Sequence, residues 1–155
     1  MSHSTPEGPA IATMKVLEVP QTLPEKIDYL LQPVLPREAK RRPLSQAEIA
    51  AWREIIDNRL SAWARDPQQF ADEGIEAPRV PMLQLAMDVA RALYDQRVEA
   101  PDRVIPNGDG GMVFRWRSGD FTLSLELDAD GSMETSLMEH NKLVCRHSLH
   151  AEATR

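Results

Sequence analysis

Residues that can ligate a transition metal gather near the C-terminal end of the chain. The single cysteine, Cys145, lies two positions before His147, and His140 and His150 complete a group within residues 140–150. On a strand, residues two apart share one face, so Cys145 and His147 should point the same way. Thiolates and imidazoles are ligands that zinc and copper take in proteins. These four residues form the candidate metal site. The alternative is that Cys145 is a small buried residue beside a His147 at a strand edge.

Three other short segments match catalytic or ligand-binding motifs only in part. The glycine-flanked hydroxyl of Ser118 lacks the strained strand-to-helix turn of a hydrolase nucleophile. The glycines at 109–111 lack the lysine and hydroxyl residue that complete a phosphate-binding loop. Residues 128–131 begin like a calcium loop, but no bidentate glutamate stands at the far end. We therefore expect no cofactor and no catalytic role, with an enzyme of unrecognised site as an alternative.

A basic cluster stands out in a chain whose net charge is −6. It consists of Arg37, Lys40, Arg41 and Arg42. Arg37, Arg41 and Arg42 are candidate contacts for a partner, and the alternative is a solvated linker. Four cations in an acidic chain predict no tight binding to duplex DNA, because non-specific phosphate contacts weaken as salt rises.

Composition indicates the broad class of protein. Hydrophobic residues make up 42% and charged residues 27% of the 155 residues, as in a single soluble globular domain. No apolar run approaches the ~20 residues of a membrane span, so no membrane partner is expected. With Cys145 as the single cysteine, no intrachain disulfide can form, and a reducing compartment, the cytoplasm, is expected.

The C-terminal half has the pattern of a β-meander. Glycine-rich turn residues at 107–111 precede an alternation of apolar and polar side chains that begins at Met112. Further alternating segments at 121–127, 132–138 and 142–149 are separated by short polar turns. Such short connections allow only antiparallel pairing. The pattern predicts an antiparallel sheet of three to four strands.

Alternation gives the predicted sheet one apolar and one polar face. The polar face carries Arg115 and Arg117 on the first strand and Glu126 and Glu134 on the next two. We expect cross-strand charge pairs here, which stabilise a sheet by up to ~1 kcal/mol and help to set its register. Because helices are expected on the other face, Arg115, Glu126 and Glu134 are candidates for contact with a partner.

The N-terminal half contains clear signals for the starts of helices. Thr22 with Glu25, and Ser45 with Glu48, have the spacing of a capping box. The first box predicts a short helix to residue 31. The second predicts a longer helix to about residue 64, along which apolar residues recur at three- and four-residue steps. Pro81 suits the first turn of another helix, which should end near residue 97.

Together these elements predict an α+β fold in which two main helices pack on one face of the meander. One domain is expected over residues 21–150, between a mobile arm at 1–20 and a frayed tail at 151–155. The matched apolar faces should meet in the core. The residues expected there are Phe114, Trp116, Leu123 and Leu125 from the sheet and Trp52, Ile56, Leu85 and Val89 from the helices.

The turn and first strand of the meander also resemble a known class of proteins. The motif Pro106-x-x-Asp109-Gly110-Gly111-x4-Trp116, with 125–131 after it, is similar to a recurrent class of small bacterial proteins of uncharacterised function. In that class a loop with Trp, Asp, Gly and Pro and an Ala/Leu-rich helix come first, as residues 63–93 do here. Arg115 departs from the pattern, because an acidic residue usually precedes that Trp. The class has no accepted activity, so the resemblance implies a fold and leaves the function open.

These observations favour a role in association. We expect an interaction or accessory protein that acts through a protein partner or as a homo-oligomer, in the manner of an antitoxin or a complex subunit. The last strand, 142–149, is expected to be an edge, and unpaired amides on an edge can template another strand. A metal-binding protein that uses the Cys145 and His147 group is the second interpretation.

Overall fold

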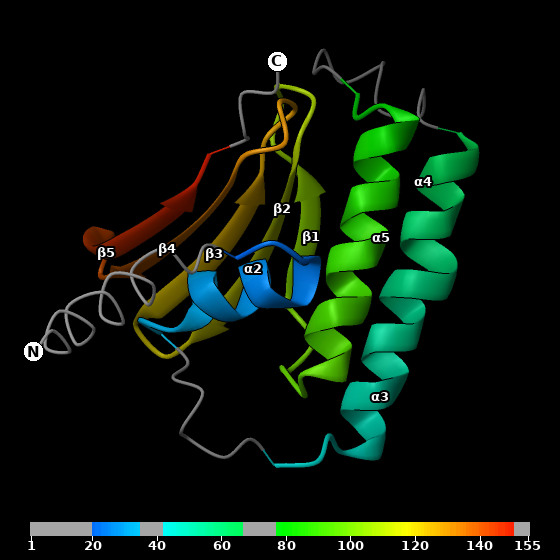
Figure 1. Ribbon diagram of the computed structural model, residues 1–155. Coiled ribbons are helices and arrows are strands. Elements are labelled where there is room, and N and C mark those ends of the chain that lie inside the picture. The colour runs from blue at the N-terminus through cyan, green and yellow to red at the C-terminus, as the bar shows by residue number, and fades with distance from the viewer. Residues whose placement is uncertain (1–19, 35–41, 67–76, 151–155) are drawn as a thin grey trace, which may run out of the picture.

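The fold is α+β, with one antiparallel sheet and helices packed on it (Figure 1). It is seen in a computed structural model that describes residues 20–34, 42–66 and 77–150. The predicted arm at 1–20, apart from Pro20, and the predicted tail at 151–155 lie outside the described residues. Strands adjacent in the chain are adjacent in the sheet, which is therefore a meander. In order they are β1 (Arg103–Pro106), β2 (Met112–Ser118), β3 (Phe121–Leu127), β4 (Met133–Glu139) and β5 (Lys142–Leu149).

Two helices begin at capping boxes, as the sequence predicts. At the start of α2 (Leu23–Leu31), the Thr22 hydroxyl accepts a hydrogen bond from the Glu25 N–H at 3.3 Å. At the start of α3 (Gln46–Arg53), the Ser45 hydroxyl accepts one from the Glu48 N–H at 3.2 Å. Each glutamate side chain in turn accepts a bond from the backbone N–H of its cap residue. These bonds satisfy N–H groups that the first turn leaves without a helical partner.

The helix that begins at α3 changes its winding in the middle. α3 passes into a π-helical segment, η1 (Glu54–Leu60), and then into α4 (Ser61–Arg65). The Ser61 hydroxyl donates to the Ile56 carbonyl, five residues back, at 3.0 Å. Ile55 and Ile56, which are adjacent in sequence, are both buried. The apolar stripe expected along one α-helical face is therefore broader in this segment.

The prediction of three to four strands is wrong, because the sheet has five and β1 was missed. β1 pairs with β2 from Arg103, opposite Arg115, to Pro106, opposite Met112. It has four residues and ends in proline, so it has neither the length nor the alternation that identifies a strand. Proline is tolerated there because β1 lies at the edge of the sheet, where a backbone N–H needs no partner strand.

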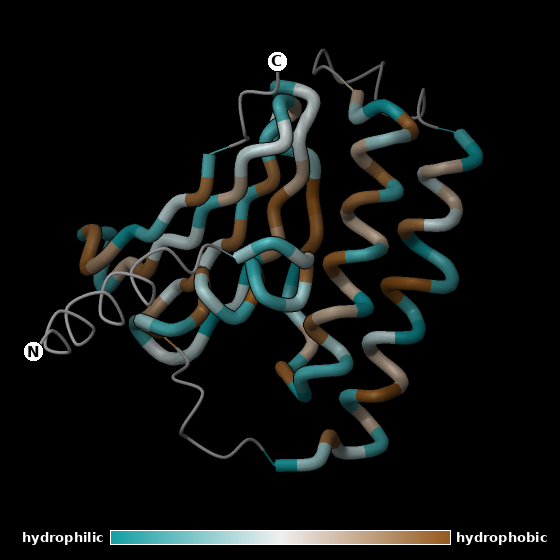
Figure 2. The backbone as a smooth tube through the Cα atoms, in the orientation of Figure 1, coloured by the Kyte–Doolittle hydropathy of each residue, from teal (hydrophilic) through white to brown (hydrophobic). Residues whose placement is uncertain are grey.

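The strand register arranges the residues that face the helices in three rows across the sheet. The first two rows are largely buried, whereas the third is only half-buried along its length. Hydrophobic and hydrophilic residues alternate along the strands (Figure 2). The first row is Met112, Leu127, Met133 and Leu149, the second is Phe114, Leu125, Thr135 and His147, and the third is Trp116, Leu123, Leu137 and Cys145.

Two helices divide this face of the sheet between them. α5 (Val80–Asp95) packs against β2, and α2 packs against β4 and β5. The helix formed by α3, η1 and α4 has its main contacts with α5 and stands beside it, on the side away from the sheet (Figure 1). This corrects the prediction that the two long helices both cover the sheet. Of the two, α5 lies on the sheet, and the short α2 supplies the other cover.

This arrangement of helices decides which of the predicted core residues are buried. Trp52 is fully buried, but its indole Nε1 donates to the Val98 carbonyl, beyond the end of α5, at 2.8 Å. Leu85 is only half-buried, and Leu83 is fully buried instead. Trp116 and Leu123 were expected in the core and are half-buried in the third row. The predicted residues that are buried are Trp52, Ile56, Val89, Phe114 and Leu125.

The turn between β1 and β2 is held by one side chain, that of Asn107. Its Oδ1 accepts hydrogen bonds from the N–H groups of Asp109 and Gly111, at 2.8 and 2.9 Å. Its Nδ2 donates to the Glu126 carboxylate on β3 at 2.9 Å. Gly111 lies so close to β3 that an added Cβ would stand 2.1 Å from the Leu127 carbonyl oxygen. Glycine is therefore required at 111 by the close approach of two strands.

We predict that Gly111→Ala destabilises the fold by about 3 kcal/mol or more, because the added methyl overlaps backbone that cannot give way. The matched control is Gly119→Ala, where φ is +62° and no atom lies within 4 Å of the new Cβ. That change should cost about 1–2 kcal/mol, from the left-handed backbone alone. Urea denaturation followed by circular dichroism measures both. Equal losses for the two variants would contradict the close approach at Gly111.

We also predict that Phe114→Ala destabilises the protein by about 3–5 kcal/mol, because Phe114 is fully buried in the second row. Trp116→Ala should cost clearly less, although the side chain is larger, because Trp116 is only half-buried. The free energies of unfolding from denaturant titrations provide the comparison. A larger loss for Trp116→Ala would show that the third row belongs to the core.

Candidate functional site

The outer edge of the sheet is formed by β5. Within the part of the chain that the structure describes, β5 pairs with β4 and no strand pairs with its other side. After Lys142, the first residues of the strand are apolar and exposed, since Leu143 is 47% and Val144 is 52% exposed. Figure 2 shows this end of the strand as hydrophobic. Free backbone groups beside exposed apolar side chains are what strand addition from another chain requires.

The register of β5 changes near this exposed end. Met138 pairs with Leu143 and Leu137 pairs with Cys145, so Val144 has no opposite residue in β4. The opposite edge of the sheet is different, because β1 is only four residues long and ends in proline. Short strands and prolines disfavour pairing with another chain. Of the two edges, β5 is the better candidate for association.

Cys145 and His147 share one face of β5, as their spacing predicts. They occupy the third and second rows, so both point to the helix side of the sheet. The ring of His147 lies against that of Tyr29 on α2, with 4.1 Å between centroids. Its Nδ1 is buried and has no hydrogen-bond partner. Cys145 is a half-buried free thiol. The pair supplies two potential metal ligands, one of them partly enclosed by α2.

His140 and His150 do not join this pair. His140 lies in the turn between β4 and β5, where its Nε2 is 3.2 Å from the Asp120 carboxylate. His150 follows the other end of β5, a strand of eight residues that spans about 25 Å. Among the described residues, no group of three or more His, Cys, Asp or Glu side chains is placed to hold a metal ion. The four candidate ligands are thus spread along a strand, not gathered at one point.

The outward face of the sheet pairs its charges differently from the expected pattern. Arg115 lies opposite Arg103 and Ser124, one row away from the acidic residues. Glu126 and Glu134 lie directly opposite each other. Glu134 accepts a bond from the Arg146 Nε at 2.9 Å, so its partner comes from the last strand. The register therefore sets like charges side by side, which the sequence alone did not reveal.

A third acid, Asp128, adds to this acidic group at the end of β3. Partial burial, and next the charge of Glu126, raise the pKa of Asp128 above its usual range, with smaller contributions from Asp130 and Glu134. The Asn107 Nδ2 lies 3.5 Å from the Asp128 carboxylate, while its closer bond is to Glu126. The Asp128 carboxylate is therefore destabilised by its surroundings whenever it is ionised.

A half-enclosed groove of about 860 Å³ opens beside the third row of the sheet. Of the predicted basic cluster, Arg42 lines this groove, while Arg37, Lys40 and Arg41 lie outside the described residues. Sequence reasoning did not find this feature, because its lining comes from segments far apart in the chain. The lining residues are Val34, Arg42, Pro43, Leu44, Ser45, Glu48, Arg97, Val98, Glu99, Trp116, Ser118, Phe121, Leu123 and Leu137.

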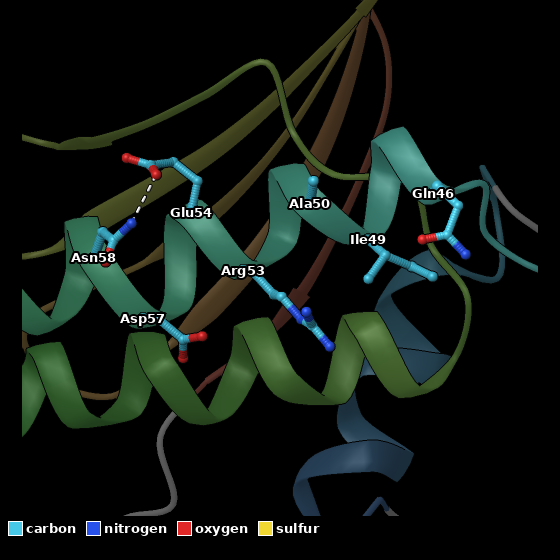
Figure 3. A pocket seen from close by; sticks show the side chains of 7 residues that line it. All are labelled: Gln46, Ile49, Ala50, Arg53, Glu54, Asp57 and Asn58. Atoms are coloured by element: carbon cyan, nitrogen blue, oxygen red, sulfur yellow. Dashed lines mark hydrogen bonds between the residues drawn. The ribbon is translucent and has the colours of Figure 1, made fainter.

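A smaller hollow of about 300 Å³ lies along the exposed side of α3 and η1 (Figure 3). Glu54 accepts a hydrogen bond from the Asn58 amide at 2.8 Å, whereas Arg53 and Asp57 point away from that pair. All the residues lining the hollow belong to one helix, so polar groups from different elements do not converge there as they do in ligand sites. They are Gln46, Ile49, Ala50, Arg53, Glu54, Asp57 and Asn58.

Neither a family nor a relative adds to this picture. Comparison of the chain with family models, with curated proteins and with solved structures finds no match. The resemblance to a class of small bacterial proteins stays a prediction. Across residues 20–34, 42–66 and 77–150, none of the helices combines the length and apolar character that crossing a membrane requires.

We predict that Asp128→Asn stabilises the protein at neutral pH. Because the folded-state pKa is raised, the folded state holds the proton more tightly than the unfolded chain, and stability falls as pH rises from the usual Asp range, near ~4, through the folded pKa. Asparagine removes this penalty, so its advantage should be present at pH 7 and shrink toward zero at about pH 3. Unfolding free energies at several pH values measure it.

The control for this prediction is Asp130→Asn. Hydrogen bonds from Ser132 lower the pKa of Asp130, so its ionised form is favoured in the folded state. The ionised Asp130 therefore stabilises the folded state above the usual Asp pKa, and this stabilisation is lost as pH falls through the lowered pKa of the folded state. Asp130→Asn should therefore not stabilise at pH 7. A gain of the same size in both variants would show that the burial and charge around Asp128 are not the cause.

Proposed function

We propose that this protein is a non-catalytic association protein that binds a second protein chain along β5. The second chain is a protein partner or another copy of the same chain. The single observation that carries the proposal is the exposed start of β5, where Leu143 and Val144 are about half exposed on the outermost strand of the sheet. Exposed apolar residues on an edge strand favour pairing with another strand, because main-chain bonds and apolar burial then act together.

The surroundings of this edge support the proposal. α2 packs behind β4 and β5, so the edge is held by a helix as well as by its neighbouring strand. The bond between Arg146 and Glu134 further ties β5 to β4. A rigid edge loses little conformational entropy when it binds, which favours association. With Cys145 as a free thiol, we place this role in the reducing cytoplasm.

The metal-binding interpretation has narrower support. Cys145 and His147 lie on one face of β5, and the His147 Nδ1 has no hydrogen-bond partner. A structural zinc site needs four ligands, and a catalytic one three with an open position. The described residues bring only this pair together, with His140 and His150 beyond the ends of the strand. We therefore keep association as the proposed function.

We predict that Leu143→Lys with Val144→Lys weakens association at least about tenfold, because the two apolar side chains that a bound strand would cover become charged. Sedimentation velocity over a range of concentrations measures self-association. Immobilised parent and variant proteins, exposed to lysate of the source cell, measure binding of a partner. The protein should retain its fold, since both side chains are about half exposed at the edge.

The matched control is Val80→Lys. Val80 is a similarly exposed apolar residue, at 45%, but it lies at the start of α5, away from the edge. It should associate like the parent in both assays. The proposal fails if the parent neither self-associates nor retains a partner, or if the association survives the double substitution in β5.

A further inference from the structure

The groove beside the third row exists because α2 covers only part of the sheet. α2 contacts the second row, where the Thr135 hydroxyl donates to the Leu30 carbonyl at 2.7 Å and Tyr29 lies on His147. In the described residues, no helix covers the third row in the same way, and Trp116, Leu123 and Leu137 remain half-buried. These three side chains line one side of the groove.

The lining of the groove is largely apolar, with an aromatic residue from each of two strands. Phe121, at 41% exposed, extends the surface formed by the third row. The Trp116 Nε1 donates to the Glu99 carbonyl at 2.8 Å, which satisfies its polar edge and leaves the rest of the ring as apolar surface. Val34 and Leu44 add apolar surface from outside the sheet. A volume of about 860 Å³ lies within the range of small-molecule sites.

Two arginines supply positive charge at the groove. Arg42 precedes α3 and Arg97 follows α5, so they come from separate segments. Both are exposed, and neither forms an ion pair within the part of the chain described. The lining also holds two acids, Glu48 and Glu99. Glu48 accepts hydrogen bonds from Ser45 in the capping box of α3, whereas Glu99 is exposed. Arg42 and Arg97 are the cationic groups that the groove offers to an anionic ligand.

The backbone of Arg97 has a conformation that is unusual for a residue with a side chain. Its φ is +62°, in the region that favours glycine. The Arg97 N–H bonds to the Tyr94 carbonyl and the Val98 N–H to the Leu93 carbonyl, which is the hydrogen-bond pattern that ends many helices with a glycine. Arginine at this position carries a steric penalty that glycine would not.

We propose that the groove binds a small anionic amphiphile, such as a medium-chain carboxylate. Its apolar tail lies on Trp116, Phe121 and Leu123, and its carboxylate is bound by Arg42 and Arg97. Burial of the tail supplies most of the affinity, while the guanidinium groups select for the negative charge. This site is separate from the β5 edge, and the inference does not depend on the association proposed above.

The test uses decanoate, with decanol as its uncharged analogue, titrated calorimetrically into the full chain below the concentration at which either aggregates. Decanoate should bind with one site per chain and change the tryptophan fluorescence. Arg97→Gly should weaken decanoate at least about tenfold, since a charged hydrogen bond is lost, and leave decanol binding unchanged. The same variant should be at least as stable as the parent to heat, so the loss cannot come from misfolding.

Two further variants complete the design. Arg42→Gln should also weaken decanoate, because it removes the second guanidinium group. Arg59→Gln, at an exposed position on η1 outside the groove, should bind like the parent. The proposal is overturned if decanoate does not bind saturably, or if it binds Arg97→Gly as tightly as the parent. It is also overturned if an uncharged apolar peptide with blocked ends binds the groove and decanoate does not.

Discussion

The hydrogen bond from the Thr135 hydroxyl to the Leu30 carbonyl joins the end of α2 to the sheet, where Ile27, Leu30 and Leu31 of the helix are buried. Leu30 lies in the last turn of α2, where carbonyl groups lack helical partners. Thr135 is a buried polar residue on β4, 2% exposed, whose hydroxyl would otherwise lose hydrogen bonds to water. This bond pairs the Leu30 carbonyl with the Thr135 hydroxyl, whose longer contact is 3.4 Å to the His147 carbonyl, and it joins residues 105 positions apart.

The length of α2 then decides how much of the sheet is covered. Its nine residues make a helix about 14 Å long, whereas a strand of seven or eight residues spans about 23–26 Å. α2 and α5 together bury the first two rows of the sheet, and the third row stays half-buried. The groove beside the third row lies where this cover ends.

The outward face of the sheet illustrates a second constraint, which is electrostatic. The register that aligns the apolar rows also places Glu126 opposite Glu134, with Asp128 close by. Asn107 and Arg146 offset this crowding by donating to Glu126 and Glu134. Burial of the inner rows outweighs the repulsion, since apolar burial on that face involves many more contacts than the few partly solvated charges. The Asp128 carboxylate remains destabilised, so substitution of this residue tests the balance between apolar burial and charge repulsion.

Features held by bonds within a few residues were predictable from the sequence. The capping boxes at Thr22 and Ser45 and the four regular strands depend on local spacing, so their patterns are visible in the chain itself. The glycine turn at 107–111 was visible as a turn, but the need for glycine at 111 comes from the Leu127 carbonyl on another strand.

Only the tertiary structure decided which residues that are distant in the sequence come into contact. β1 is a strand because β2 offers it a pairing edge, although its own four residues carry no strand pattern. Arg146 became the partner of Glu134, and the groove formed from segments before α3, after α5 and in three strands, because packing brought them together. The spacing of residues indicates which side chains lie on the same face of a helix or strand. It does not indicate which other segment that face will meet, because many pairings bury similar apolar area and the choice rests on the whole core.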